Sequence, residues 1–307
     1  MSTRSPDTRE RLVASLLPVV RFGLRHGPAP LRRVIRDQII RRYVAWRQIP
    51  LDFRLSDGLR VRGDLRDVIV RSLYMDGTWD PSLRDLLAAQ LSEGDVFVDV
   101  GANFGLFSLV ASRMVGASGA VIAIEASPTT FARLLDHLRV NEADNVVAVN
   151  VAASDHVGHV SIHSSDATNP GASTIVADAQ ELAARHATFE AEIEAKPLHE
   201  IVPRALWPRI KAIKIDVEGA EAEVLRGLEP MLSALPAETA IAVEITRSLL
   251  SRVYGLTPQQ LLAPFRARGF IAYQRAEDSG PPTPLGDGDP VFNAWETADL
   301  ILRRVPI

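Results

Sequence analysis

The sequence predicts a Rossmann-like α/β fold: a mostly parallel sheet with an antiparallel closing strand, preceded by an α-helical amino-terminal arm. Short apolar strands alternate with amphipathic helices from residue 92 onward, which is typical of parallel sheets covered by helices. A glycine-containing turn at 101–105 joins the first of these strands to its helix. The composition, 47% hydrophobic and 23% charged over 307 residues, is that of a globular protein with a sizeable core.

The composition also excludes several kinds of site. The chain has no cysteine, which excludes disulfides, zinc–thiolate sites, iron–sulfur clusters and a cysteine nucleophile. The longest apolar stretch near the start, 12–24, contains Pro18 and Arg21 and is shorter than the ~20 residues of a spanning helix. No small-residue cleavage site of the A-x-A kind follows it. We therefore expect a soluble, cytoplasmic protein.

Charge is unevenly distributed along the chain. Residues 1–47 contain eleven arginines and three acidic residues, a net charge of +8; because the whole chain carries −4, residues 48–307 carry −12. Helical spacing over 10–47, with a break at His26-Gly27-Pro28, predicts a basic helical arm over 1–50. Two roles stay open for this arm. It could contact an anionic membrane or a partner, or it could pack on its own domain or across a homo-oligomer.

Two short elements lead from the arm into the sheet. Alternating apolar and polar residues around Ser56-Asp57-Gly58 predict a hairpin within 51–71. Residues 81–91 have helical spacing. We therefore assign 51–91 to a hairpin and helix that lead into the core, and 92–307 to the main domain.

The main domain opens with strand–helix alternation, is interrupted around 154–205, and then resumes. The strands that we expect are 96–100, 120–125, 146–151, 157–162, 212–217, 240–245, 270–273 and the closing 299–305. The expected helices are 106–114, 128–140, 177–195, 220–228 and 258–268, with loops at 168–173 and 279–290. We interpret 154–205 as an insertion into the alternating core.

The first candidate site is the turn Asp99-Val100-Gly101-Ala102-Asn103-Phe104-Gly105. Ligands of open α/β sheets bind at the carboxyl ends of the strands, near the switch in strand order. Small residues there allow a ligand to approach the backbone, and free N–H groups at the helix start can hold a carboxylate. Glu125 ends the next strand, where its carboxylate can accept both hydroxyls of a ribose. Together they predict a nucleoside-bearing ligand.

Two classes of nucleoside-bearing ligand fit this turn. A dinucleotide requires G-x-G-x-x-G, but the later glycine positions counted from Gly101 hold Asn103 and Leu106. S-adenosyl-L-methionine has no phosphate, and its cationic amine favours a carboxylate such as Asp99. The sequence therefore favours S-adenosylmethionine over NAD. In the alternative interpretation, Asp99 caps the turn or the helix and Glu125 is an exposed carboxylate at a strand end.

The second candidate site is Lys214-Ile215-Asp216-Val217-Glu218-Gly219-Ala220-Glu221. Side chains alternate along a strand, so Lys214, Asp216 and Glu218 tend toward one face. Charges at the end of a central parallel strand require a partner or a ligand. Because this strand end should lie beside the glycine turn, we expect Asp216 and Glu218 to border the transferred methyl group. The alternative is an internal Lys214–Asp216 ion pair with Glu218 as a helix cap.

These two motifs, with Val224-Leu225-Arg226-Gly227, resemble the FkbM family of S-adenosylmethionine-dependent methyltransferases over about 91–244. The resemblance implies a class I methyltransferase sheet. It implies active-site roles for Asp216 and Glu218, and it places the adenine near Ala153, just past the third strand. It also implies that the cofactor is bound by Asp99, Gly101, Asn103, Gly105 and Glu125. The family commonly has an E-P step where this chain has Glu125-Ala126-Ser127-Pro128.

Methyl transfer is an in-line displacement, so the enzyme chiefly aligns the acceptor with the methyl carbon. A general base assists a hydroxyl acceptor, and the candidates are Asp216, Glu218 and His163. Asp216, Glu218, Glu221 and Glu244 could in principle supply oxygen ligands to Mg²⁺, but their spacing matches no recognisable ligand pattern, so we predict no metal. We expect 163–200 and 279–290 to shape acceptor specificity.

We therefore predict an O-methyltransferase that acts on a hydroxyl of a small molecule, natural product or glycan; the acceptor class comes from the resemblance. One alternative is a nucleotide-dependent Rossmann oxidoreductase. Another is a non-catalytic module that the arm docks on a membrane or a partner. Nucleic acid is not an expected partner, because the basic residues are concentrated in the arm without an interleaved set of aromatic residues.

Overall fold

The computed structural model describes residues 8–44, 47–165, 173–176, 178–184, 186–276, 280–286 and 288–306. These residues form two compact units, which we describe separately. The arm unit contains the described residues up to Trp79 together with Ser165, and the sheet unit contains Asp80–Ser164 and the described residues from 173 to 306. The division into 1–50, 51–91 and 92–307 stays a prediction.

The described part of the arm unit combines four helical segments with a hairpin. Its elements are α1 (Thr8–His26), α2 (Ala29–Val34), the π-helical η1 (Ile35–Val44), β1 (Pro50–Arg54), β2 (Arg60–Asp64) and α3 (Val68–Met75). The break between α1 and α2 lies at the predicted Gly27-Pro28, and β1 and β2 pair antiparallel as the alternation predicts. Leu17, Leu24 and Ile35 pack into a small core with Met75. One side of the arm helices is therefore buried within their own unit. No helix among the described residues has the length and apolar character needed to cross a bilayer.

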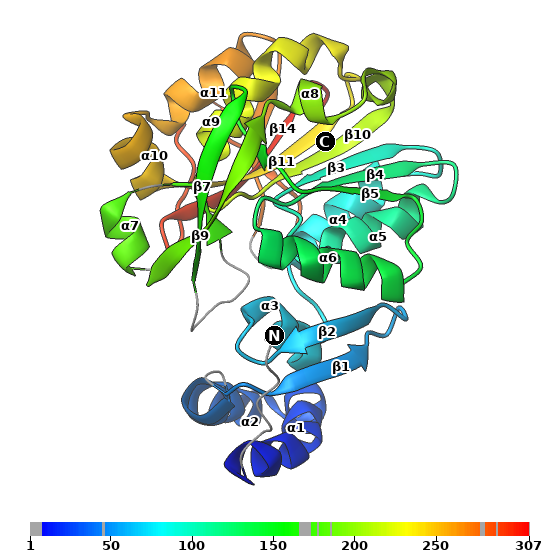
Figure 1. Ribbon diagram of the computed structural model, residues 1–307, viewed down its shortest axis with the longest axis vertical. Coiled ribbons are helices and arrows are strands. Elements are labelled where there is room, and N and C mark those ends of the chain that lie inside the picture. Colours follow the sequence, from blue (N-terminus) through cyan, green and yellow to red (C-terminus); the bar gives the residue numbers. More distant parts are fainter. Residues whose placement is uncertain are drawn as a thin grey trace. The chain divides into compact units, whose positions relative to one another are not determined.

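The sheet unit is built on an eight-stranded mixed sheet with the order β13-β12-β14-β11-β10-β3-β4-β5 (Figure 1). Strands β11, β10, β3, β4 and β5 are parallel, and β14 lies antiparallel between β11 and β12. The bounds are β3 (Val96–Val100), β4 (Ala120–Ile124), β5 (Val146–Val149), β10 (Ile210–Ile215), β11 (Ala240–Thr246), β12 (Ile271–Gln274), β13 (Thr283–Pro284) and β14 (Thr297–Arg303). The predicted mostly parallel sheet with an antiparallel closing strand is confirmed.

Helices cover both faces of this sheet (Figure 1). One face carries α4 (Pro81–Gln90), α5 (Leu106–Val115) and α6 (Pro128–Val140), and the other carries α8 (Leu198–Ile201), α9 (Glu221–Leu228) and α11 (Pro258–Arg266). The sequence does not predict α8, α10 (Arg247–Tyr254), η2 (Arg204–Arg209) or η3 (Glu229–Ala234). All five residues of β3 are buried, which explains why its sequence is almost continuously apolar.

The strand order reverses between β3 and β10. From β3 the chain continues to β4 and β5 on one side, and it later returns to β10 and β11 on the other. Lys214 of β10 is in register with Asp99 of β3, and Ile215 with Val100. The ends of the two motif-bearing strands therefore lie side by side at the point where open α/β sheets bind ligands.

The predicted helix over 177–195 is wrong. Of the described residues in this range, only α7 (Ala179–Ala184) is helical, and β9 (Ala187–Lys196) is a strand of a second sheet with the order β6-β9-β7-β8. The other strands of this sheet are β6 (Ala152–Ala153), β7 (Gly158–Ser165) and β8 (Ser173–Thr174).

The composition of β9 explains this error. Alanine and glutamate favour helices intrinsically, but exposed Glu192 and Glu194 alternate with the less exposed Ile193 and Ala195, a period of two. Pairing with neighbouring strands outweighs the intrinsic propensity. Of the predicted loop 168–173, only Ser173 lies within the described residues, and it belongs to β8.

Candidate active site

The turn after β3 is in close contact with the end of β10. Gly101 has φ +76°, and a Cβ at this position would lie 1.8 Å from the carbonyl oxygen of Asp216. The N–H of Asp216 donates to the carbonyl of Val100 at 3.1 Å, and the N–H groups of Gly101 and Ala102 both donate to Ile124 at 2.9 Å. The ends of β3, β4 and β10 therefore form one connected edge, on which Gly101 cannot be replaced without moving backbone.

Two further residues of the turn, Asn103 and Gly105, have a left-handed backbone conformation. Asn103 has φ +52°, and its Oδ1 accepts the N–H of Phe104 at 2.7 Å. Gly105 has φ +91°, and a Cβ there would lie 2.5 Å from Cδ1 of Leu134 on α6. Close packing thus accounts for Gly105, and a local hydrogen bond stabilises the uncommon backbone conformation of Asn103.

Glu125 follows β4 and is buried against this turn. Its Oε2 accepts the N–H of Asn103 at 2.8 Å, and its Oε1 accepts the N–H of Ser127 at 2.9 Å. Burial raises the pKa of Glu125 to about 7, although both hydrogen bonds favour the ionised form. Each carboxylate oxygen has a second lone pair, so Glu125 could still accept two ligand hydroxyls. It is not the exposed carboxylate of the alternative interpretation.

Asp99 and Lys214 form a buried pair beneath the turn. Asp99 Oδ2 accepts the hydroxyl of Ser108 at 2.6 Å, and Asp99 Oδ1 lies 3.6 Å from Lys214 Nζ. The same ammonium donates to the carbonyl of Gly101 at 3.0 Å and lies 3.3 Å from Asp216 Oδ2. Burial opposes the charge on Lys214, but the carboxylates of Asp216 and Asp99 outweigh it and raise the pKa of the lysine. Lys214 therefore links the two motifs.

Asp216 lies at the accessible end of this chain of charges, with 42% of its side chain exposed. The predicted Lys214–Asp216 ion pair is present, but Glu218 is not the cap of the next helix, since the N-cap of α9 is Ala220 without a side-chain hydrogen bond. Glu218 instead has φ +56°, and its carbonyl accepts the hydroxyl of Thr174 from β8 at 2.9 Å. Asp216 thus combines a fixed position with an exposed carboxylate.

The turn that carries Glu218 is also held from within. Glu221 is buried, and its Oε1 accepts the N–H groups of Val217 and Gly219 at 3.1 and 3.0 Å. Burial raises the pKa of Glu221 to about 7. Glu221 therefore stabilises the turn from inside, and its buried carboxylate is not freely accessible as a metal ligand.

Two further acids adjoin Asp216 on the neighbouring strands. Glu244 of β11 is in register with Asp299 of β14, and Arg275 donates to Asp299 at 2.5 Å. Burial raises the pKa of Glu244 to about 9, and the charges of Asp216 and Asp299 add to this effect. Glu244 is therefore protonated near neutral pH. The described residues contain no group of three or more histidine, aspartate or glutamate side chains arranged to hold a metal ion.

Sequence reasoning misses Glu190, which ties the second sheet to the start of α6. Its carboxylate accepts the hydroxyl of Ser127 at 2.9 Å, the N–H of Thr129 at 2.9 Å and the hydroxyl of Ser164. Burial opposes ionisation of Glu190, but hydrogen bonds from Ser164, Thr129 and Ser127 lower its pKa. Ser127 is also a donor to Glu125, so Glu190 supports the same turn. The period-two pattern of β9 could have identified the strand, but Glu190 has the same parity as the exposed Glu192 and Glu194, so the pattern does not single out Glu190.

The two remaining candidates lie on the second sheet. Ala153 is buried in β6, directly after β5. His163 of β7 is in register with Thr174, the residue that holds the Glu218 carbonyl. Nδ1 of His163 is buried and lacks a hydrogen-bond partner within the described part of the chain. The structure therefore gathers Asp99, Gly101, Asn103, Gly105 and Glu125 around one turn, Asp216 and Glu218 after β10, and Ala153 after β5.

Comparison with known proteins identifies the family. A model of the methyltransferase FkbM domain matches residues 99–270, more than half of the chain and both motifs. The chain belongs to the FkbM methyltransferase family. The predicted family, the class I methyltransferase fold and S-adenosylmethionine as cofactor are thereby confirmed.

Individual relatives of this FkbM methyltransferase are distant. It is 27% identical over 186 residues to methyltransferase sdnD of Sordaria araneosa, covering 52% of this chain and 68% of the relative. It is 28% identical over 162 residues to the hexuronic acid methyltransferase AglP of Haloferax volcanii, covering 52% and 59%. The chain thus spans about two thirds of the length of the first relative and less than two thirds of the second.

The chain also matches solved structures at low sequence identity. Fibrillarin of Aeropyrum pernix, with natively bound S-adenosylmethionine, matches with a TM-score of 0.41 and 13% identity over 82% of each chain. A putative rRNA methylase of Clostridium thermocellum matches with a TM-score of 0.43 and 13% identity over 74% of this chain and 95% of that one.

Proposed function

We propose that this methyltransferase transfers the methyl group to a hydroxyl of a small molecule, natural product or glycan, and that Asp216 contacts that hydroxyl. The observation that carries the proposal is the position of Asp216. It lies at the β3–β10 switch point, its backbone touches the glycine turn, and its carboxylate is partly exposed. An acceptor oxygen bound to Asp216 would lie next to the ligand bound at the glycine turn.

The residues of the turn suit S-adenosylmethionine, which supplies a methyl group already activated on a sulfonium when it is bound. Glu125 would accept the ribose hydroxyls through its second lone pairs. The backbone at Gly101 and Gly105 would contact the methionine portion. Ala153 would leave room for the adenine. Because Asp99 is fully buried, we propose that it contributes by holding Lys214 and, through Lys214, the turn.

Asp216 would align the acceptor and take up its proton. Because a carboxylate is a much weaker base than an alkoxide, we expect proton transfer to accompany formation of the carbon–oxygen bond and not to precede it. Lys214, 3.3 Å from Asp216 Oδ2, fixes one side of the carboxylate and leaves the other side for the acceptor. Glu218, two residues further along the same turn, is the second group on this side. His163 is a third candidate, since its Nδ1 is unpartnered within the described residues.

The second sheet is well placed to shape acceptor specificity. Thr174 contacts the Glu218 turn, and Glu190 contacts the start of α6 beside Glu125, so this sheet reaches both halves of the site. The other segment that we predict from the sequence to shape acceptor specificity is 279–290. Its described part contains β13, which pairs with β12, and three strands separate β13 from β10. We therefore restrict the specificity proposal to the second sheet.

An acceptor screen tests the proposed function. The protein is incubated with trideuteromethyl-labelled donor and three acceptor classes, namely uronic acids, neutral glycans and hydroxylated natural products, and the products are analysed by mass spectrometry. Uronic acids come first because one relative is named a hexuronic acid methyltransferase. We expect label on an oxygen of one class, and loss of that label in Asp216→Asn. Label on nitrogen, on carbon or on the carboxylate of a uronic acid would contradict methylation of a hydroxyl.

A further inference from the structure

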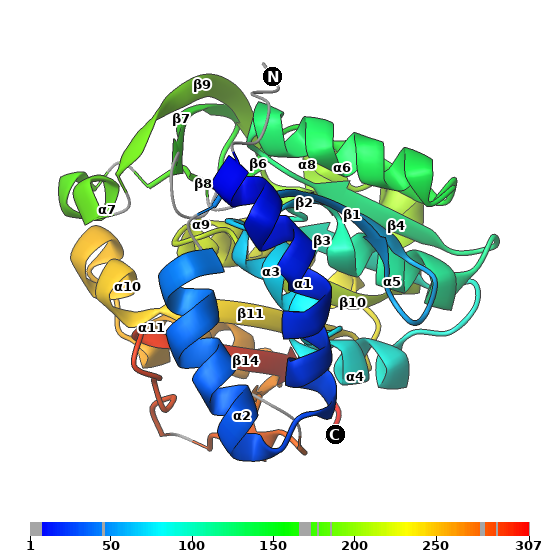
Figure 2. The same cartoon turned by 90° about the horizontal axis from the view of Figure 1, so that it is seen from below.

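The arm unit has an apolar surface that its own core does not cover. On α1, Leu17 and Leu24 are buried, whereas Leu12, Leu16, Val19 and Phe22 are exposed. These four residues recur every three or four positions and therefore form one stripe along the helix. Leu31 and Val34 add two more exposed apolar residues on α2, and the six side chains are 45 to 69% exposed. Figure 2 shows α1 and α2, the two helices that carry them.

The charged residues within the segment that carries this stripe have one sign. Residues 11–36 contain six arginines and no acidic residue. The side chains of Arg25, Arg32, Arg33 and Arg36 are exposed; Arg25 also donates to the carbonyl of Met75, and Arg36 pairs with Asp76 of the same unit. Exposed leucine, valine and phenylalanine beside arginine are typical of helices that lie in a membrane interface.

Charge complementarity decides between the occupants of this surface. A second copy of the same face would bring arginines against arginines, which repel each other. A protein partner would have to be negatively charged over the whole contact, whereas an anionic bilayer offers continuous negative charge above an apolar interior. We propose that the α1–α2 surface docks this chain on an anionic lipid bilayer, with the apolar stripe in the headgroup region and the arginines at lipid phosphates.

Vesicle co-sedimentation with the full chain tests this proposal. Vesicles of phosphatidylcholine alone are compared with vesicles that also contain phosphatidylglycerol, at low and at high salt. We expect binding to the anionic vesicles, weakened by salt because the arginine contribution is screened. Arg32→Gln should weaken binding about fivefold. Phe22→Ser should weaken it tenfold or more, since it removes an aromatic ring from the apolar stripe.

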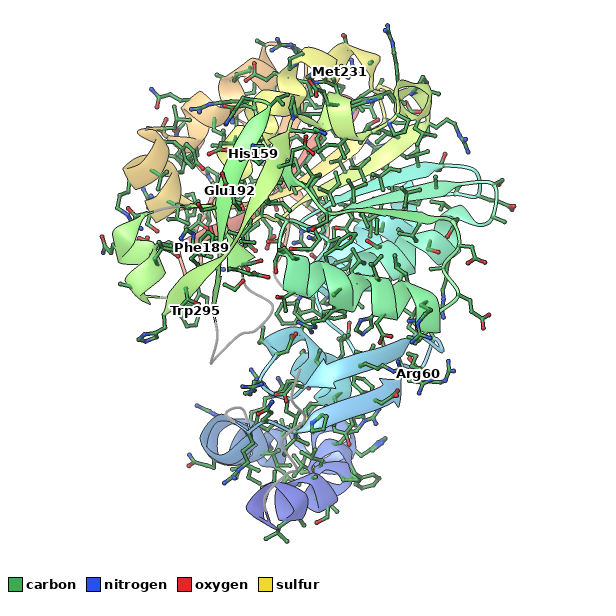
Figure 3. The ribbon with its side chains drawn as sticks, viewed as in Figure 1. Arg60, His159, Phe189, Glu192, Met231 and Trp295 are labelled. Carbon is green, nitrogen blue, oxygen red and sulfur yellow. The ribbon has the colours of Figure 1, made fainter. Side chains whose placement is uncertain are left out.

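Trp295→Ser is the matched control for Phe22→Ser. Trp295 is an aromatic residue of the sheet unit that is 84% exposed (Figure 3), so its replacement should leave binding unchanged. Circular dichroism shows whether each variant is folded as the parent. Absence of binding to anionic vesicles, or equal binding to neutral ones, would overturn the proposal. So would a dimer in sedimentation velocity that Phe22→Ser dissociates, because the occupant would then be a second copy.

Discussion

Two strand–turn–helix connections of this protein have nearly the same sequence and opposite environments. After β3 the chain has Asp99-Val100-Gly101-Ala102, and after β10 it has Asp216-Val217-Glu218-Gly219-Ala220, with one additional residue before the glycine. Asp99 lies inside its strand and is completely buried, whereas Asp216 follows its strand and has 42% of its side chain exposed.

Register explains the difference between the two aspartates. Lys214 is paired with Asp99 across the two strands, so Asp216 lies two residues closer to the carboxyl edge of the sheet. An aspartate below this edge supports the turn from inside, and an aspartate at the edge can contact a ligand. The role of each carboxylate is therefore set by its position along the strand more than by the motif around it. Three pairs of variants and two single variants sharpen or break this comparison.

The largest effect is expected for the glycines of the two turns. Gly101→Ala would place a methyl group against the backbone of Asp216, whereas Gly219→Ala would meet Cδ1 of Leu249 at 2.5 Å, a side-chain atom that can move. We expect Gly101→Ala to lower the free energy of unfolding by more than about 3 kcal/mol, and Gly219→Ala by about 1–3 kcal/mol, mainly from its positive φ. Urea unfolding measures both, and equal losses would show that the two turns are equally tolerant.

The next effect concerns the two aspartates themselves. Asp99→Asn removes a buried negative charge that Lys214 faces, so we expect a loss of about 3 kcal/mol in the free energy of unfolding. Asp216→Asn breaks an ion pair whose carboxylate is partly exposed, and should cost less than about 1 kcal/mol. Thermal and urea unfolding of both variants check this order. A larger loss for Asp216→Asn would contradict the assigned environments.

The third effect is a pH dependence of donor binding. Ligand hydroxyls donate to an ionised Glu125, and the pKa of this group is about 7 because it is buried. Donor affinity should therefore be constant well above pH 7 and fall about tenfold for each pH unit below it. Glu125→Gln should bind more weakly but without this dependence. Equilibrium dialysis with S-adenosylhomocysteine at several pH values measures it; an unchanged slope in the variant would exclude Glu125 as the titrating group.

Burial of these carboxyl groups gives the free energy of unfolding the opposite pH dependence to that of donor binding. Glu125 and Glu221 have pKa values raised to about 7, and Glu244 to about 9. The folded state then holds protons that the unfolded state releases above its ordinary carboxyl pKa. Their contribution to stability is complete below about pH 4 and is lost as the pH rises through the folded values. Glu244→Gln should flatten the decline between about pH 7 and 9.

The smallest effect is expected from the second sheet. Glu190→Gln weakens the hydrogen bonds to Ser127 and Thr129 at the start of α6, so donor affinity should fall about threefold. Glu192→Gln is the matched control, because Glu192 is an exposed neighbour on the same strand (Figure 3). Donor titrations of the two variants compare them, and equal affinities would remove Glu190 from the support of the turn.

Local patterns were sufficient for the strands of the central sheet except β13, which lies in the predicted loop 279–290, and insufficient for the contacts that join distant segments. The apolar run 96–100 and the glycines after it predict β3 and its turn, because these features depend on neighbouring residues. The strand identity of β9 depends on pairing with β6 and β7, and the contact between Glu190 and Ser127 spans 63 residues. The charges of Lys214 and Asp99 are visible in the sequence, but the depth at which they pair follows only from the register.

Methyl transfer by Asp216→Asn under single-turnover conditions tests the central claim most directly, with donor affinity measured on the same sample. The account predicts donor affinity within about twofold of the parent and transfer at least about a hundredfold slower. Transfer at the parental rate would contradict the placement of Asp216 against the acceptor, and loss of donor binding would place Asp216 in the cofactor site instead.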